Sequence, residues 1–422
     1  MLGSREQFGA PRHCPIEPQA SPMSTSSPLP LGRLWLYALG LTLAFKLLYQ
    51  FGGLAAYGLL EQLGYLNTGK FHHWLAFQLA WGVPTEPHFY DMFCRWDCEW
   101  YLRIVRQGYP ATDFTSPDYR IHHSNHAFFP FLPLQIHLVM FLTGLQAPWA
   151  ALLVSCVNTT AALAGLYRLV ETLYAPGLAR ATVAVLLAFP LNHHLHMIYP
   201  EAFFLAALTW GLWGVVRRKW GLVLLLGVAL GLTRPNGFVA GFSFLLLYLE
   251  RYGWPHPRSL VGRHAAVWAL TGPLLGYLAQ NTYLYTRTGD FFAQMTAMQA
   301  WAANVLKKPM LEFVFYHSDW YIQLMSWAVV VYLLAALSTF LAPIRWGWKL
   351  HWLMWTGLLL PLFIGNTVLS IQRYMQVVFP WMLSLGYWLL RLPRWGQLGL
   401  FALGLVVQVM LLPLWLEQWW LL

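Results

Sequence analysis

Acid, base and aromatic side chains lie next to one another in the stretch Phe93-Cys94-Arg95-Trp96-Asp97-Cys98-Glu99-Trp100-Tyr101, where a polar segment begins that runs to His126. A carboxylate at the edge of a membrane cavity can take a proton from a hydroxyl nucleophile if it lies within hydrogen-bond reach and its surroundings tune its pKa. Asp97 is therefore the candidate general base, with Glu99 as a supporting acid. The alternative is a salt bridge with interfacial aromatic residues at a helix end.

Two arginines stand out because each interrupts or adjoins an apolar run: Arg234 and Arg373. Charged groups in or beside membrane segments are costly and are treated as functional hypotheses. A guanidinium binds phosphate through two parallel hydrogen bonds, so both arginines are candidates to hold a lipid-linked phosphate. The alternatives are snorkelling of Arg373 to the interface and a helix-breaking polar turn at Arg234 that is tied to other helices.

Cysteines and histidines raise the question of a metal. Cys94 and Cys98 flank Asp97, but the fixed patterns of zinc sites are absent, which favours two packed thiols over zinc. Four cysteines are also too few for a disulfide framework. Histidines cluster at 122–126 and 193–196, yet no acid or thiol recurs around them at a ligand spacing, so they are polar loop residues, phosphate partners or ligands of a divalent cation.

The composition is that of a polytopic membrane protein. Hydrophobic residues make up 58% of the 422 residues and charged residues 10%, against about a quarter in soluble domains. Because the hydrocarbon core cannot satisfy backbone polar groups, the expected fold is all-α. The net charge of +10 comes from basic residues in short connectors, which indicates membrane topology and no nucleic-acid partner.

The domain plan follows from the apolar runs. Residues 1–32 are rich in Pro, Ser and charge and are expected to be a disordered cytoplasmic tail, followed by one transmembrane domain over 33–422. Candidate spans, each near the roughly 20 residues that a bilayer needs, lie at about 34–60, 127–145, 148–172, 181–198, 201–216, 219–250, 264–286, 321–343, 350–369, 374–390 and 397–416. The run 219–250 contains Thr233-Arg234-Pro235-Asn236-Gly237 and should split into two short helices.

About eleven crossings are expected, with 127–145 as a partial or tilted span because it carries two prolines. The positive-inside rule places five basic connectors in the cytoplasm: Arg33, 217–219, 251–263, 345–349 and 391–394. Threading the chain through them puts five polar stretches outside: 61–126, 192–201, the Arg234 turn, 287–319 and 370–373. Their convergence on one side is the main indication of a site.

Several motifs, in order, carry a resemblance. Arg95-Trp96-Asp97 with Tyr101 and Gly108-Tyr109, followed by Ala127-Phe128-Phe129-Pro130 and Pro133, resembles the first-loop signature of the PIG-V family, the GPI mannosyltransferase 2 family. Later segments resemble that family in the same order: Tyr199-Pro200-Glu201-Ala202-Phe203, Thr233-Arg234-Pro235-Asn236-Gly237, Gly289-Asp290 with Gln299 and Trp301, and Gln372-Arg373-Tyr374 with Phe379-Pro380. The match spans roughly residues 93 to 380.

The resemblance implies a GT-C fold whose first outer loop (61–126) carries the catalytic aspartate, Asp97, with 287–319 as a second large outer loop. It also implies a polyprenyl-phosphate sugar donor, which for this family is dolichyl-phosphate mannose, and in eukaryotes a GPI precursor as acceptor in the endoplasmic reticulum. The short, Trp-rich chain looks more like a bacterial relative, acting on a glycolipid or protein at the outer face of the plasma membrane. It departs from the family pattern at Cys98-Glu99-Trp100.

These observations predict an inverting displacement. Asp97 deprotonates an acceptor hydroxyl, while Arg234, Arg373 and Arg95 bind the donor phosphate. Residues expected to contact substrate are Glu99, Trp96, Tyr101, His126, Tyr199, Glu201, Asn236, Asp290, Gln299, Trp301 and Tyr374.

Two other classes of protein stay open. A transporter or flippase for a lipid or polyol would also have broken helices, but it would usually show repeats, and Arg95-Trp96-Asp97 has no second copy. A membrane scaffold gives no reason for an acid and arginines on one side. A nucleotide-sugar enzyme is disfavoured because the chain has no P-loop and no soluble domain of sufficient size.

Overall fold

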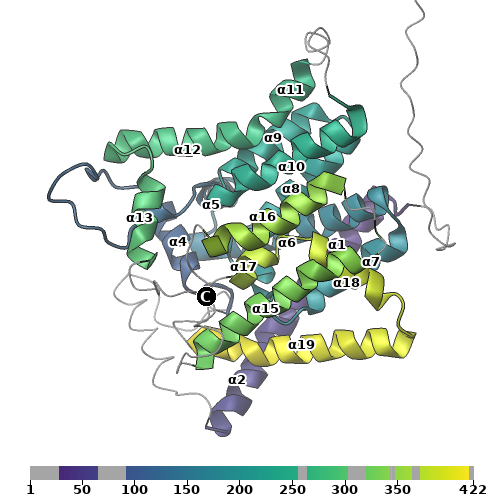
Figure 1. The fold of residues 1–422 in the computed structure, drawn as a ribbon. Coiled ribbons are helices and arrows are strands. Elements are labelled where there is room, and N and C mark those ends of the chain that lie inside the picture. The colour runs from purple at the N-terminus through teal and green to yellow at the C-terminus, as the bar shows by residue number, and fades with distance from the viewer. Residues whose placement is uncertain are drawn as a thin grey trace, which may run out of the picture.

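The chain folds as a bundle of helices (Figure 1). The computed structural model describes residues 28–64, 92–254, 264–302, 320–342, 344, 347–363 and 371–417, and this part of the chain contains helices and connections but no strand. The helix pattern lets each segment satisfy its backbone hydrogen bonds internally, which a bilayer requires. Most of the expected N-terminal tail lies outside the described residues, and the first helix begins at Leu31.

The α-helices, in chain order, are α1 (Leu31–Leu47), α2 (Gly53–Gln62), α4 (Asp97–Gln107), α5 (Phe131–Thr143), α6 (Ala147–Leu173), α7 (Pro176–Ala188), α8 (Glu201–Val216), α9 (Trp220–Gly231), α10 (Pro235–Tyr252), α11 (His264–Leu270), α12 (Gly272–Thr288), α13 (Ala293–Ala302), α15 (Trp320–Leu341), α16 (Gly347–Phe363), α17 (Ile371–Met375), α18 (Pro380–Leu389) and α19 (Arg394–Glu417). The π-helical turn η1 (Leu48–Gly52) joins α1 to α2, and two 3-10 turns, η3 (Asn125–Ala127) and η4 (His193–His196), stand between helices.

Three of these segments are long and apolar enough to cross a membrane: Leu31–Gln62, Ala147–Leu173 and Arg394–Trp415. Shorter apolar helices include α5, α7, α8 and α9. The all-helical, apolar fold is thus consistent with a bilayer environment. With 13 residues, α5 is about 20 Å long and falls short of the roughly 30 Å hydrocarbon core, in line with the partial span expected there.

Helix breaks are more frequent than the apolar runs indicated. The break in 219–250 is confirmed, since α9 ends at Gly231 and α10 begins at Pro235. The run 264–286 was wrongly predicted as one helix: α11 ends at Leu270 and α12 begins at Gly272, with Pro273 in its first turn, where proline favours a new helix start. The run 181–198 is also shorter than expected, as α7 ends at Ala188, two residues before Pro190.

Small residues set the closest helix packing. Gly227 and Gly231 on α9 face Gly272 and Gly276 on α12, so two G-x-x-x-G motifs meet. A Cβ atom at Gly276 would lie 2.1 Å from the carbonyl oxygen of Val228, which excludes any larger residue. Such close backbone approach is how membrane helices associate without a hydrophobic driving force between them.

The rest of the bundle is built from further helix pairs. α6 packs along α8, α10 along α16, and α4 against α5. The short α17 contacts α15 and α16 and lies near the middle of the bundle in Figure 1.

Candidate active site

Four charged side chains form one connected network. Nη1 of Arg373 lies 2.6 Å from Oδ2 of Asp97, and its Nε lies 2.9 Å from Oε1 of Glu201. The same Glu201 oxygen is 2.7 Å from Nη2 of Arg234. The order of the network is Asp97, Arg373, Glu201, Arg234, and two acids balance two bases.

The four groups differ in burial and in how fully they are bonded. The Glu201 side chain is fully buried, whereas that of Asp97 is 18% exposed. Oε2 of Glu201 and Nη1 of Arg234 are buried and have no hydrogen-bond partner. Buried polar groups in proteins are normally satisfied, so this network has bonding capacity that its own members do not use.

Each member is positioned by a helix start. Asp97 and Glu201 are the first residues of α4 and α8, where the helix dipole favours a negative charge. Arg234 precedes α10, and Arg373 lies in α17. Gly237 makes the turn after Arg234 possible, because a Cβ atom there would lie 2.1 Å from the carbonyl oxygen of Leu230 at the end of α9.

The backbone just before Asp97 is strained. Trp96 has φ +55° and ψ −112°, a left-handed conformation that a bulky residue rarely adopts. Its indole Nε1 donates to the carbonyl of Trp415, 3.2 Å away, and the Tyr199 hydroxyl donates to the carbonyl of Arg95 at 2.8 Å. Such strain persists only where the surroundings hold it, and it concentrates at functional sites.

The cysteines beside Asp97 correct the sequence interpretation. Cys94 and Cys98 form a disulfide, with Cα atoms 5.2 Å apart, and are neither two packed thiols nor zinc ligands. The count of four cysteines argued against a framework of several bridges, which does not exclude one local bridge. Cys156 is the free cysteine among the described residues.

Aromatic rings cover both arginines. The Arg373 guanidinium lies 4.6 Å from the Tyr199 ring centroid, and that of Arg234 lies 5.2 Å from the Tyr374 ring centroid. Tyr101, on the buried face of α4, packs edge-on against Phe128, and burial raises its pKa so that its hydroxyl stays protonated. The predicted residues Tyr199, Glu201 and Tyr374 thus join Asp97 and the arginines.

Glu99 does not share the environment of Asp97. Both belong to the first turn of α4, and residues two apart on a helix point in different directions. The helical conformation therefore separates the two acids, and Asp97 is the one paired with Arg373.

Other predicted residues have contacts outside the four-charge network. His126 bonds the carbonyl of Pro110 at 2.9 Å, and burial lowers its pKa. Asp290 accepts hydrogen bonds from the Phe292 amide and the Thr296 hydroxyl at the start of α13. Gln299 is exposed on α13. The side chain of Trp301 lies outside the described residues.

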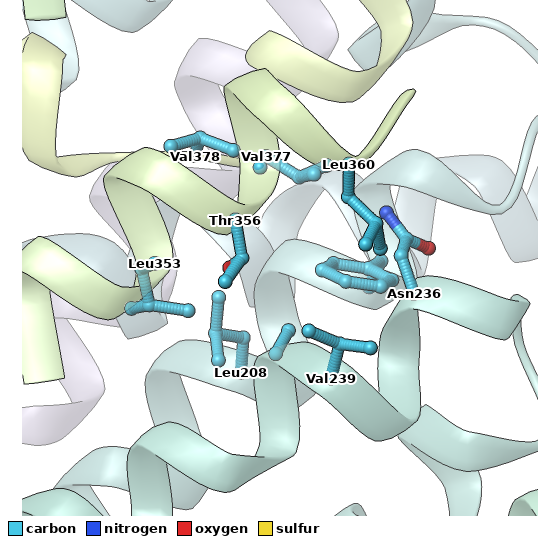
Figure 2. Close-up of a pocket in the computed structure, with 11 residues that line it drawn as sticks. Leu208, Asn236, Val239, Leu353, Thr356, Leu360, Val377 and Val378 are labelled. Atoms are coloured by element: carbon cyan, nitrogen blue, oxygen red, sulfur yellow. The ribbon is translucent and has the colours of Figure 1, made fainter. Parts of the chain in front are cut away.

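Asn236 borders a small, mainly apolar pocket between α8, α10 and α16 (Figure 2). Apolar side chains such as Leu208, Val239 and Val377 line it, and the side-chain oxygen of Asn236 has no hydrogen-bond partner. The space admits a guest of about one water molecule and cannot hold a lipid chain in this conformation. Two of its lining residues, Asn236 and Val377, follow Arg234 by two positions and Arg373 by four, so the pocket is a neighbour of the network in sequence.

The second histidine cluster is part of the protein interior. His193, His194 and His196 are buried in η4, and their ring nitrogens have no hydrogen-bond partner. Trp415 packs edge-on against both His193 and His194. No group of three or more metal-ligating side chains occurs within the described ranges.

Sequence reasoning missed Lys46. This lysine is buried in α1 and donates to the Ser155 hydroxyl at 2.8 Å and to the carbonyl of His196. It thereby ties the first helix to α6 and to the turn that leads into Tyr199 and Glu201. The signal was present, because a lysine within an apolar run is itself a functional or structural flag.

The comparisons add no relative. No family model, no curated protein and no solved structure matches this chain.

Proposed function

We propose that this chain is a multi-pass membrane glycosyltransferase that moves a sugar, most simply mannose, from a polyprenyl-phosphate donor to an acceptor hydroxyl on a glycolipid or protein. The observation that carries the proposal is the pairing of a partly exposed acid, Asp97, with Arg373 in a network whose second arginine, Arg234, has an unused donor. An acid for the acceptor and two guanidinium groups for a phosphate are the groups that such a transfer needs.

In the proposed step, the Asp97 carboxylate takes the proton of the acceptor hydroxyl. The resulting oxygen attacks the anomeric carbon from the side opposite the phosphate, and the bond between that carbon and the phosphate oxygen breaks. Arg373 and Arg234 donate N–H bonds to the departing phosphate, where negative charge accumulates. Glu201 holds both guanidinium groups in place and keeps them from repelling one another.

The same proposal gives the chain about eleven crossings of the bacterial plasma membrane, or of the endoplasmic reticulum in a eukaryote, with the network facing outward. The basic connectors support it, among them 217–219 between α8 and α9. We expect a single cysteine placed at Asp113 to be labelled by an impermeant thiol reagent from outside, and one at Lys219 only from the cytoplasm. Labelling of both from the same side would reject this orientation.

The test of function is an assay on the purified protein in liposomes. Polyprenyl-phosphate mannose is supplied as donor and membrane lipid extract as acceptor, and sugar transfer and free polyprenyl phosphate are measured by mass spectrometry. We expect both products in equal amount, and neither from the Asp97→Asn protein. Absence of transfer from mannose, glucose and other hexose donors would reject the proposal.

A transporter or flippase is the second candidate, and the helix breaks favour it. α9 and α10 are broken at Arg234-Pro235, and α11 and α12 at Gly272-Pro273. Broken helices are frequent at transport sites. Movement of the lipid phosphate across the liposome bilayer without chemical change would support this candidate over the enzyme.

A further inference from the structure

The Cys94–Cys98 disulfide closes a ring of five residues, and Asp97 is one of them. Both cysteines are buried, at 5% and 0% exposure. The covalent ring therefore contains the acid of the network and ends one residue beyond it. Neither the proposed transfer nor the packing of α4 by itself requires a bridge at this position.

Inside the ring the backbone makes a tight turn. The Cys98 amide donates to the Arg95 carbonyl at 3.1 Å, so Trp96 and Asp97 occupy the two central positions. At the first of them, Trp96 has φ +55° and ψ −112°, which is the conformation of a type II′ turn, normally taken by glycine. A tryptophan there costs free energy, and the turn must be held from outside.

The contacts that hold the turn come from three directions. The disulfide joins Cys98, the last residue of the turn, to Cys94, the residue before it. Trp96 donates to the Trp415 carbonyl on α19, and Tyr199 donates to the Arg95 carbonyl. The disulfide is the covalent one. It is also the contact that a reducing agent can break without any substitution in the sequence.

We propose that Cys94 and Cys98 are positioning residues, whose disulfide holds the strained Trp96 turn and thereby sets Asp97 against Arg373. The site is then assembled only where the bond can persist. Disulfides persist in oxidising compartments, so the bond places Asp97 on the outer side by an argument independent of the basic connectors. The effect on catalysis rests on the proposed function, whereas the effect on conformation does not.

The bond is broken by dithiol exchange. One sulfur of dithiothreitol attacks Cys94 or Cys98 and forms a mixed disulfide, and its second sulfur then closes the reagent's ring and releases the protein thiol. Both electrons and both protons come from the reagent. The products are two cysteine thiols and one cyclic disulfide.

The first experiment establishes the state of the cysteines. The full-length protein, purified in detergent from membranes of an oxidising compartment, is denatured, alkylated with and without prior dithiothreitol, and analysed by peptide mass spectrometry. We expect Cys94 and Cys98 to be alkylated only after reduction. Free thiols at both positions in the untreated protein would overturn the proposal.

The second experiment measures conformation by hydrogen exchange. Backbone exchange is followed in peptides over 92–107 and 371–377 in the parent protein, its reduced form and the Cys94→Ser/Cys98→Ser protein. Removal of a covalent loop closure should accelerate exchange in both peptides by about tenfold or more. Peptides of α9 and α12 should be unchanged, as should every peptide of the Cys156→Ser control. Equal exchange in the oxidised and reduced proteins would overturn the proposal.

The third experiment tests whether the Cys94–Cys98 disulfide affects catalysis. Misplacement of a reacting group by about 1 Å can cost about 100-fold in rate, so we expect kcat to fall by at least tenfold on reduction while KM for the donor changes less. Reoxidation should restore kcat in the parent protein and not in the double variant. If the double variant does not accumulate, reduction of the parent protein provides the same comparison.

The two failures are distinguishable. If the parent protein has no transfer activity but its hydrogen exchange still depends on the disulfide, the proposed function is rejected and the positioning role of the disulfide stands. If the parent protein is active but neither its kcat nor its hydrogen exchange changes on reduction, the positioning role of the disulfide is rejected and the proposed function stands.

Discussion

The two ends of α10 carry two different ionic assemblies. At its start, Arg234 belongs to the four-membered network with Glu201, Arg373 and Asp97. At its other end, Glu250 pairs with Lys349 of α16, whose Nζ lies 2.7 Å and whose backbone N lies 3.1 Å from the carboxylate. The helix has 18 residues and is about 27 Å long, close to the thickness of the hydrocarbon core.

The difference lies in unused bonding capacity. The pair at the far end joins one acid to one base, and both carboxylate oxygens of Glu250 accept hydrogen bonds. The network at the near end has a reachable acid, Asp97, and leaves one oxygen of Glu201 and one nitrogen of Arg234 without a partner. A closed pair ties two helices together, whereas an open network can in addition take a ligand.

The largest effect expected from this difference is on Asp97. The change Asp97→Asn keeps the shape and removes the proton acceptor, so transfer should fall by the roughly 100- to 10,000-fold typical of a general base. The matched change Glu99→Gln, on another side of α4, should leave measurable activity. Hydrogen exchange of 92–107 checks that the fold is retained. Robust turnover by Asp97→Asn would reject the assignment, and an inactive Glu99→Gln beside an active Asp97→Asn would reverse the two roles.

Arg373→Lys should come next in size. Lysine keeps the charge but loses the planar fork that reaches both Asp97 and Glu201, so we expect transfer to drop by about 100-fold, the scale of one lost transition-state donor. Expression and membrane insertion should stay normal. The exposed Arg391 supplies the control, because Arg391→Lys touches only Tyr387 and Trp388 among its described contacts. Parent-like activity of Arg373→Lys would exclude phosphate binding through its fork.

Glu201 and Glu250 are expected to differ in how much each contributes to the free energy of unfolding. Glu201→Gln leaves two buried guanidinium groups with one carboxylate between them, and should cost about 3–5 kcal/mol, as for other broken buried ion pairs. Glu250→Gln leaves one buried lysine instead of two buried guanidinium groups, and the carboxylate that it removes is itself 22% exposed, so it should cost only about 1–2 kcal/mol. Thermal unfolding in detergent measures both. Equal shifts in melting temperature would mean that the two ends of α10 are equivalent structural pairs.

The last expectation concerns pH and the buried histidines. Burial lowers the pKa of His193 to about 3, whereas an unfolded chain holds histidine near 6.5. Below about pH 6.5 this histidine is protonated in the unfolded chain but stays neutral in the folded protein down to about pH 3. Its contribution to the free energy of unfolding is therefore fully present above pH 6.5 and falls by up to about 1.4 kcal/mol per pH unit towards pH 3.

Melting temperatures between pH 8 and pH 4 check this expectation. His193→Phe should flatten the acid side of the curve, while His122→Gln, at an exposed position, should not. An unchanged slope in His193→Phe would show that this histidine does not control acid unfolding.

The sequence by itself determined the all-helical, apolar character and most of the helix positions. The 201–216 run became α8 with the same bounds, and Arg234-Pro235-Asn236-Gly237 broke the 219–250 run as expected. These features are local, because composition, proline and glycine act on the backbone within a few residues. The choice of Asp97, Arg234, Arg373 and Glu201 as candidates also came from residue type and setting.

Only the tertiary structure decided which of those candidates meet. Glu201 and Arg373 are 172 residues apart in sequence and 2.9 Å apart in space, while His126 and Asp290, chosen by the same reasoning, lie in other surroundings. The bond between Cys94 and Cys98 could likewise not be predicted from the sequence, because a four-residue spacing fits packed thiols and a bridge equally well, and only the folded backbone brings the two Cα atoms to 5.2 Å. Long-range pairing depends on how helices pack, and helix packing is fixed by close contacts such as those of Gly231 and Gly276, which no local pattern specifies.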